Sequence, residues 1–245
     1  MLPISRALKV ALPFLLVAAA AAPATAQGPL QAVIYGGTEL DTQDLRMFLA
    51  GIDVHTNRPG LGVGVGVMAY NLTYPVVEGR TESVNGVQPS VALRYQWPTS
   101  SVQASVGYLF MDGENEVLGA GAPGGARDGV VGSLQAISWG DGTRSIEGIA
   151  SYNFDAEYAW TRLRGSKMLN PSVDGRGLSL GAELVLQGTT SDDTYRAIQV
   201  GPVAEFAISP GLRLVGVVGG KADNRLDAPS VFPYFKLEFV AIPGL

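Results

Sequence analysis

Apolar and polar residues alternate almost without interruption over two neighbouring segments, residues 87–97 and 102–110. Successive side chains of a β-strand point to opposite faces, so a period of two predicts two strands whose faces meet different surroundings. The sequence Pro98-Thr99-Ser100 between them predicts a turn, and therefore a hairpin. The ends of the pattern carry aromatic pairs, Tyr95 with Trp97 and Tyr108 with Phe110, as strands of outer-membrane barrels do at the membrane interfaces.

The same pattern recurs along most of the chain and predicts about twelve strands. The expected strands are residues 31–39, 47–55, 61–74, 87–97, 102–110, 130–139, 144–154, 157–164, 178–187, 195–208, 212–221 and 231–240. In the third strand, leucine and valine alternate with glycines at positions 62, 64 and 66. Repeated glycine in a strand marks close backbone approach or curvature. We therefore expect a glycine row that faces a lumen and makes room for large neighbours.

The first residues have the pattern of a secretory signal peptide. Arg6 and Lys9 precede an apolar run over residues 10–22, and an Ala-x-Ala cleavage pattern follows at Ala24 and Ala26. The run is short for a membrane-spanning helix. We expect a signal peptide over residues 1–26 and a single exported domain over residues 27–245.

Two architectures fit the strand pattern, a transmembrane barrel and a soluble β-sandwich. Expected connections are short at residues 98–100, 140–143, 155–156 and 209–211, and longer at 75–86, 112–129, 165–176, 188–194 and 222–230. Short turns on one side and long loops on the other are typical of an outer-membrane barrel, whose short turns face the periplasm. Charged mid-strand residues such as Arg94 and Glu183 would be costly in a dry sandwich core, whereas a wet lumen solvates them. We predict an all-β fold, an antiparallel up-and-down transmembrane β-barrel of 10–12 strands; the sandwich remains the alternative.

Composition narrows the function classes. The full chain has a net charge of −5, and removal of Arg6 and Lys9 makes it more negative, which argues against a nucleic-acid partner. There is no cysteine and one histidine, His55, which disfavours disulfides and a transition-metal site. A barrel hydrolase would need His55 beside a serine and a carboxylate, and no local pattern provides them. We therefore predict no enzymatic activity, no catalytic residue, no metal and no cofactor.

One cluster of aromatic and basic residues is the candidate binding site. Aromatic faces beside guanidinium groups suit polysaccharide stacking and hydroxyl contacts, in the lumen or at its edge. The same residue types would also serve as an aromatic girdle with basic residues near lipopolysaccharide headgroups. The candidate residues are Tyr158, Trp160, Arg162, Arg164, Tyr195 and Arg196, with Lys167 close by in the sequence.

The second half of the chain resembles the bacterial cellulose biosynthesis protein BcsS family. The similar segments are 147–154 (EGIASYNF), 158–164 (YAWTRLR), 177–188 (GLSLGAELVLQG), 193–201 (DTYRAIQVG), 209–214 (SPGLRL) and 233–239 (PYFKLEF). The resemblance covers roughly residues 145–240. It implies a small exported barrel associated with cellulose synthesis, without an active site to carry over.

Together these observations predict a non-enzymatic barrel in the cell outer membrane, an accessory component of cellulose or exopolysaccharide biosynthesis and secretion. The expected partners are outer-membrane lipid and lipopolysaccharide, with cellulose synthase or secretion components, or the glucan itself, as candidates. The alternative function is a small porin-like outer-membrane channel. A lipid-modifying hydrolase that uses His55 is a third hypothesis.

Overall fold

A computed structural model describes residues 30–77, 80–112, 128–140, 142–170, 176–190, 195–224 and 230–243. The regular structure in these ranges is β-strand, and no helix in them is long and apolar enough to cross a membrane. The strands are β1 (Leu30–Asp41), β2 (Arg46–Thr56), β3 (Gly60–Val77), β4 (Arg80–Trp97), β5 (Ser100–Asp112), β6 (Gly129–Ser138), β7 (Arg144–Asn153), β8 (Tyr158–Met168), β9 (Gly177–Thr189), β10 (Arg196–Ser209), β11 (Leu212–Asp223) and β12 (Ser230–Ala241).

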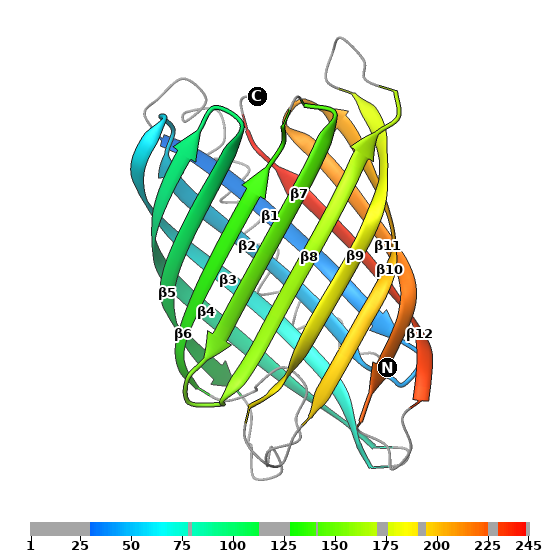
Figure 1. Ribbon diagram of the computed structural model, residues 1–245. Helices are drawn as coiled ribbons and strands as arrows, with labels where there is room; N and C mark the ends of the chain where they lie inside the picture. Colours follow the sequence, from blue (N-terminus) through cyan, green and yellow to red (C-terminus); the bar gives the residue numbers. More distant parts are fainter. Residues whose placement is uncertain are drawn as a thin grey trace.

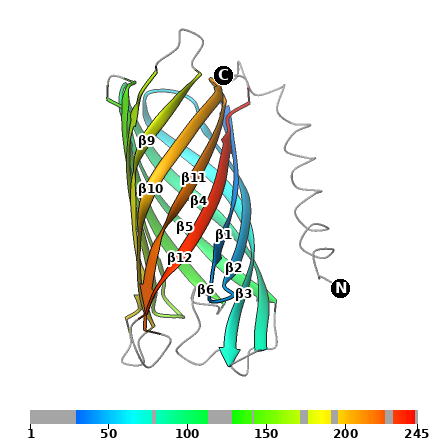
Figure 2. The ribbon, with the colours of Figure 1, turned by 90° about the vertical axis from the view of Figure 1, so that its right-hand side faces the viewer.

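The strands form one closed barrel in which each strand pairs with its neighbours in the sequence. Every pairing is antiparallel, and β1 closes the ring against β12 from Ile34↔Ala241 to Asp41↔Tyr234. The strands tilt strongly across the wall of the barrel (Figures 1 and 2). Closure leaves no unpaired sheet edge, so the backbone groups of the wall are bonded within the sheet. The predicted fold class and the upper limit of the predicted strand number are confirmed.

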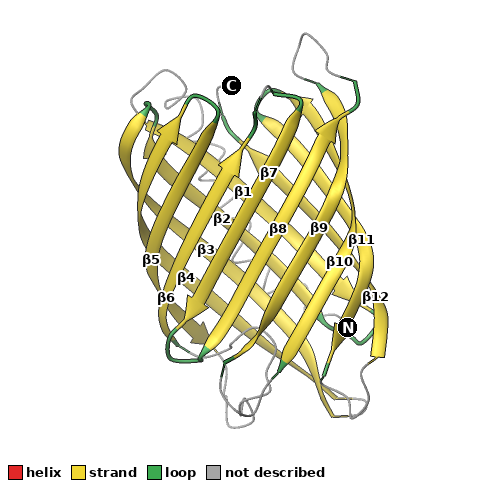
Figure 3. Cartoon of the chain, viewed as in Figure 1, coloured by secondary structure: helices red, strands yellow, loops and turns green. Residues whose placement is uncertain are grey.

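The connections fall at two ends of the barrel (Figure 3). We call the end where β1 begins and β12 ends the terminal end; residues 57–59, 98–99, 139–143, 169–176 and 210–211 connect strands there. The opposite loop end holds the connections 42–45, 78–79, 113–128, 154–157, 190–195 and 224–229.

The predicted separation of short and long connections is only partly correct. The short turn at 155–156 lies at the loop end, because β7 ends and β8 begins there. The Asn153 side chain accepts hydrogen bonds from the amides of Asp155 and Ala156 at 3.1 and 3.2 Å, which closes the turn tightly. The longer connection after β8 lies at the terminal end. It is also shorter than expected, since β8 continues to Met168.

The predicted loop at residues 75–86 is wrong, because β3 and β4 continue as paired strands to Val77 and from Arg80. The sequence pattern fails here because the outward positions are polar. Thr73 and Ser83 share a hydrogen bond of 2.7 Å, and Asn71 donates one of 3.0 Å to Asn85. Strands that leave an apolar surrounding no longer need apolar outward side chains, so their alternation disappears.

The outer surface is an apolar band between aromatic ends. Val65, Val91 and Val106 are among the exposed outward residues between these ends. Tyr95 packs against Trp97 near the terminal end, with ring centroids 4.4 Å apart. Tyr108 packs against Phe110 near the loop end, at 4.7 Å. This distribution matches the outside of a membrane barrel.

The glycine row of β3 faces inward, as predicted. Gly64 and Gly66 pair with His55 and Asp53 of β2, whose side chains lie on the same face. A Cβ atom at Gly66 would overlap Asp53 Oδ1, and one at Gly64 would lie 3.2 Å from the His55 Cβ. The row therefore makes room for the larger side chains of its neighbouring strand.

A different glycine provides a test of the wall geometry. A Cβ atom at Gly181 of β9 would overlap the Gly165 carbonyl oxygen of β8, whereas one at Gly148 would have no neighbour within 4 Å. We expect Gly181→Ala to lower the free energy of unfolding by about 1–3 kcal/mol, because the backbone must shift. Gly148→Ala is the matched control and should have little effect. Urea unfolding of the refolded protein in detergent measures both; equal stabilities would contradict this close approach.

Candidate functional site

The strand alternation directs most of the charged and polar mid-strand residues into the lumen, which has two unlike sides. On the inner faces of β9–β12, which we call the filled side, Glu183, Gln199 and Lys221 are 0–1% exposed. On the inner faces of β4–β7, the open side, most central residues are half-buried, among them Gln103 and Gln135. Solvent therefore reaches the open side and is largely excluded from the filled side.

The filled side is built around the carboxylate of Glu183. Arg164 Nε of β8 donates a hydrogen bond to Glu183 Oε2 at 3.0 Å. Lys236 Nζ of β12 donates to Glu183 Oε1 at 2.8 Å. A buried carboxylate needs such partners, because an unpaired charge away from water is costly. Both oxygens of this buried acid are thus neutralised by cations from different strands.

A second group of ion pairs crosses the lumen. Arg162 Nη1 of β8 donates to Glu238 of β12 at 3.1 Å, although these two strands are not neighbours in the barrel. Arg162 Nη2 donates to Glu147 Oε2 at 2.8 Å. Glu147 also accepts a hydrogen bond of 2.9 Å from Gln135. The bridge to Glu238 links two parts of the wall that are separated by three strands.

The network continues to β1. Lys236 Nζ lies 3.5 Å from Glu39, and Gln199 Nε2 donates to Glu39 at 2.7 Å. Lys221 Nζ donates to Asp41 at 3.1 Å and lies 3.5 Å from Glu39. Strands β7 to β12 and β1 are therefore linked through their inner side chains.

The structure places four of the six predicted site residues together on the inner face of β8. Tyr158, Trp160, Arg162 and Arg164 alternate there with outward residues, and the Arg162 guanidinium lies 5.8 Å from the Trp160 ring centroid. Both arginines point into the lumen and bind carboxylates there.

Of the other two predicted residues, Tyr195 lies with this group and Arg196 does not. Tyr195 packs against Tyr158, and the two hydroxyls are linked through Gln187 by hydrogen bonds of 3.0 and 3.3 Å. Arg196 is exposed at an outward position of β10, since Ala197 holds the inward one. Lys167 is also outward and exposed. Tyr195 and Arg196 are adjacent in the sequence, so the strand alternation predicts that they lie on opposite faces of the wall.

Several residues of the network were not among the predicted site residues. Glu39, Lys221 and Lys236 lie at inward positions of β1, β11 and β12. Each is a charged residue in a strand that is otherwise rich in apolar and small residues, and a charge at an inward position is the signal that could have found them. The sequence does not give their partners, because these depend on contacts across the lumen.

A smaller polar group lies on β1, β2, β4 and β5. Arg94 Nη1 lies 2.6 Å from His55 Nε2, which in turn lies 3.1 Å from Gln31 Oε1. Arg94 Nη2 donates to the Ser101 hydroxyl at 3.4 Å. His55 Nε2 therefore contacts a guanidinium and an amide.

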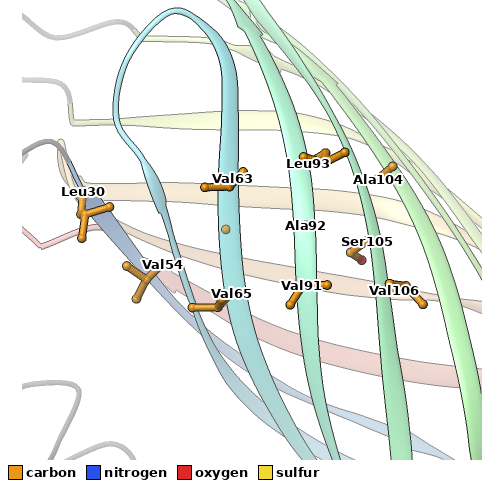
Figure 4. Close-up of a pocket in the computed structure, with 11 residues that line it drawn as sticks. Leu30, Val54, Val63, Val65, Val91, Ala92, Leu93, Ala104, Ser105 and Val106 are labelled. Carbon is orange, nitrogen blue, oxygen red and sulfur yellow. The ribbon is translucent and has the colours of Figure 1, made fainter.

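An apolar hollow lies on the outside of the barrel, as Figure 4 shows. Outward residues of β1–β5 line most of it, among them Leu30, Val63 and Leu93. These side chains do not point into the lumen, and the lining offers almost no polar group for a solute. The hollow therefore belongs to the apolar outer band.

Comparisons with known proteins identify the fold. No family model and no curated protein matches the chain. Among solved structures, the KdgM porin in complex with disordered oligogalacturonate has a TM-score of 0.51 at 11% identity, over 85% of this chain and 98% of that one. An outer-membrane channel from Pseudomonas putida F1 gives 0.51 at 11% identity over 87% and 94%. The β domain of the Bordetella autotransporter BrkA gives 0.50 at 13% identity over 87% and 98%. The chain thus has the fold of outer-membrane barrels.

The buried ion pairs of the filled side predict how a substitution there changes the free energy of unfolding. Glu183→Gln removes the charge that Arg164 and Lys236 share, and should lower the free energy of unfolding by about 2 kcal/mol or more. Glu205→Gln is the matched control: its partner Arg213 has a 54% exposed side chain, so we expect a loss under about 1 kcal/mol. Urea titration in detergent compares the two variants, and a larger loss for Glu205→Gln would contradict the arrangement.

Proposed function

We propose that the protein is a porin-like channel of the outer membrane, which passes small hydrophilic solutes along the open side of its lumen. The observation that carries this proposal is the contrast between the two sides. A barrel whose whole interior was packed would serve only as an anchor. Here the buried, ion-paired residues are concentrated on the filled side, and the open side keeps accessible polar side chains.

The open side has the chemistry of a passage for hydrated molecules. Its half-buried residues are mainly hydroxyl, carboxamide or small side chains: Gln88, Ser90, Ala92, Gln96, Gln103, Ser105, Ser133, Gln135 and Ser151. Ser105 and Ser133 share a hydrogen bond of 2.5 Å across β5 and β6. Neutral donors and acceptors can replace water around a solute without holding it tightly.

The filled side supports a narrow passage. Its ion pairs connect β8 with β12, and β12 with β1, and breaking one would leave a buried charge without a partner. It therefore acts as a permanent wall. A barrel of eight strands is filled by side chains and one of sixteen has a wide channel, so a half-filled barrel of twelve suits small solutes.

The outer surface and the likeness to membrane barrels support the location. The apolar band suits hydrocarbon, and the aromatic pairs at its ends suit the two interfaces. Two of the similar structures are channels by their descriptions, a porin and an outer-membrane channel. The accessory role in cellulose production and its partners stay predictions, since no contact in the barrel favours them over a channel.

Adjacent residues of β5 provide a test of conduction. Ser105 faces the lumen opposite Ala92 and Ser133, whereas Ala104 faces outward. We expect Ser105→Trp to reduce single-channel conductance in planar bilayers to about half or less, because the indole enters the passage. Ala104→Trp places the same side chain in the lipid and should leave the conductance unchanged. Failure of the unmodified protein to conduct, or equal conductance in the two variants, would disprove the proposal.

The membrane-facing surface has a matched test on β6. Leu134 is 53% exposed at an outward mid-strand position, and the adjacent Gln135 faces the lumen beside Glu147. Leu134→Arg should destabilise the barrel in lipid vesicles by about 2–4 kcal/mol, because it places a charge in hydrocarbon. Gln135→Arg should be tolerated. The stabilities are measured by urea titration; an unaffected Leu134→Arg protein would argue against membrane contact there.

A further inference from the structure

The lysine and arginine side chains that face the lumen differ in whether a carboxylate lies beside them. Six lysine or arginine residues with described side chains face inward, and five of them lie within 3.5 Å of a carboxylate. These five are Arg162, Arg164, Arg213, Lys221 and Lys236. The sixth, Arg94, has His55 and Ser101 as its partners, and both side chains can be neutral. Within the described ranges, its charge is not balanced by an ion pair.

Arg94 also retains hydrogen-bonding capacity. A guanidinium has five N–H groups, and the contacts with His55 and Ser101 use two of them. Gln103 lies directly opposite Arg94 on β5, and Gly62 lies opposite on β3. Gln96 follows on the same inward face. An unbalanced cation is thus surrounded by carboxamide and hydroxyl groups that can donate further hydrogen bonds.

The position of Arg94 makes the group reachable. The side chain is half-buried on the open side, three residues before β4 ends at the terminal end of the barrel. The guanidinium geometry matches the two oxygens of a carboxylate or of a phosphate. Carboxamides and hydroxyls suit the hydroxyl groups of a sugar.

A carboxylate on the inner face of β2, two strands away from β4, opposes this charge. Asp53 lies on the same face as His55, one inward position further toward the loop end, with its side chain over Gly66. No ion pair joins it to Arg94 among the described residues. Asp53 should therefore weaken the binding of an anion at Arg94 without replacing it.

We propose that Arg94, with the half-buried Gln103 and Gln96, forms a binding site for the oxyanion group of a hydroxyl-rich solute, a sugar acid or a sugar phosphate. This inference rests on the proposed channel and names the solute class for which its open side is selective. The guanidinium binds the carboxylate or phosphate, and the neutral side chains bind the hydroxyl groups.

The experiment measures how solutes block the potassium chloride current through the channel in planar bilayers. The probes are glucuronate, glucose 6-phosphate and neutral glucose, so that the carboxylate and the phosphate are compared with the sugar alone. We expect both anions to block at lower concentration than glucose. Arg94→Gln should weaken block by the anions about tenfold or more and leave glucose unaffected, because it removes a charge-assisted hydrogen bond. Arg94→Lys should keep part of the effect.

Two further variants serve as controls. Arg213→Gln removes the same charge near the terminal end, from a residue already paired with Glu205, and should leave anion block unchanged. Asp53→Asn should strengthen anion block. Equal anion block in Arg94→Gln and in the unmodified protein would overturn the inference while the channel stands. If the protein does not conduct, the proposed function fails, and calorimetric titration of the same anions into detergent-solubilised Arg94→Gln and unmodified protein decides the site separately.

Discussion

The buried ion pairs between β8 and β12 are the interaction on which the interior depends. A barrel wall satisfies its own backbone, but the side chains of its inner face must be either wet or paired. Arg164, Glu183 and Lys236 meet this requirement by pairing, and their pairing excludes water from β9–β12. The remaining width of the lumen is consequently left to β4–β7, whose inner side chains are mainly neutral and need no partner to be stable in water.

This division also explains why the electrostatics of the lumen are local. Most cations are held by carboxylates within the wall, so their fields largely cancel over a short distance. A charged residue outside these ion pairs therefore has a stronger electrostatic effect on a solute than the same charge would have in a lumen crowded with ions. Arg94 is in this position because the opposite residue of β3 is Gly62, which contributes neither a charge nor a side chain.

Much of the barrel follows from the sequence, because alternation reports directly on two unlike surroundings. The hairpin of β4 and β5, the inward glycines of β3 and the inward acids Glu147 and Glu183 were predictable in this way. The alternation does not report where both faces are polar, which is why the extension around Ser83 was missed. The alternation also does not show which inward side chains contact one another. Arg162 and Glu238 are 76 residues apart in the chain and lie on strands that do not pair, and only the curvature of the barrel wall brings their side chains together.

Glu39 has a consequence for assembly. This β1 residue accepts contacts from Gln199, Lys236 and Lys221, which belong to the three last strands. The seam between the first and last strands is therefore fastened from inside as well as by its backbone ladder. These contacts form only when β12 reaches β1, so the final step of insertion completes the burial of the charges. A barrel arrested before that step would expose an incomplete set of ions to water, and its seam would remain easy to separate.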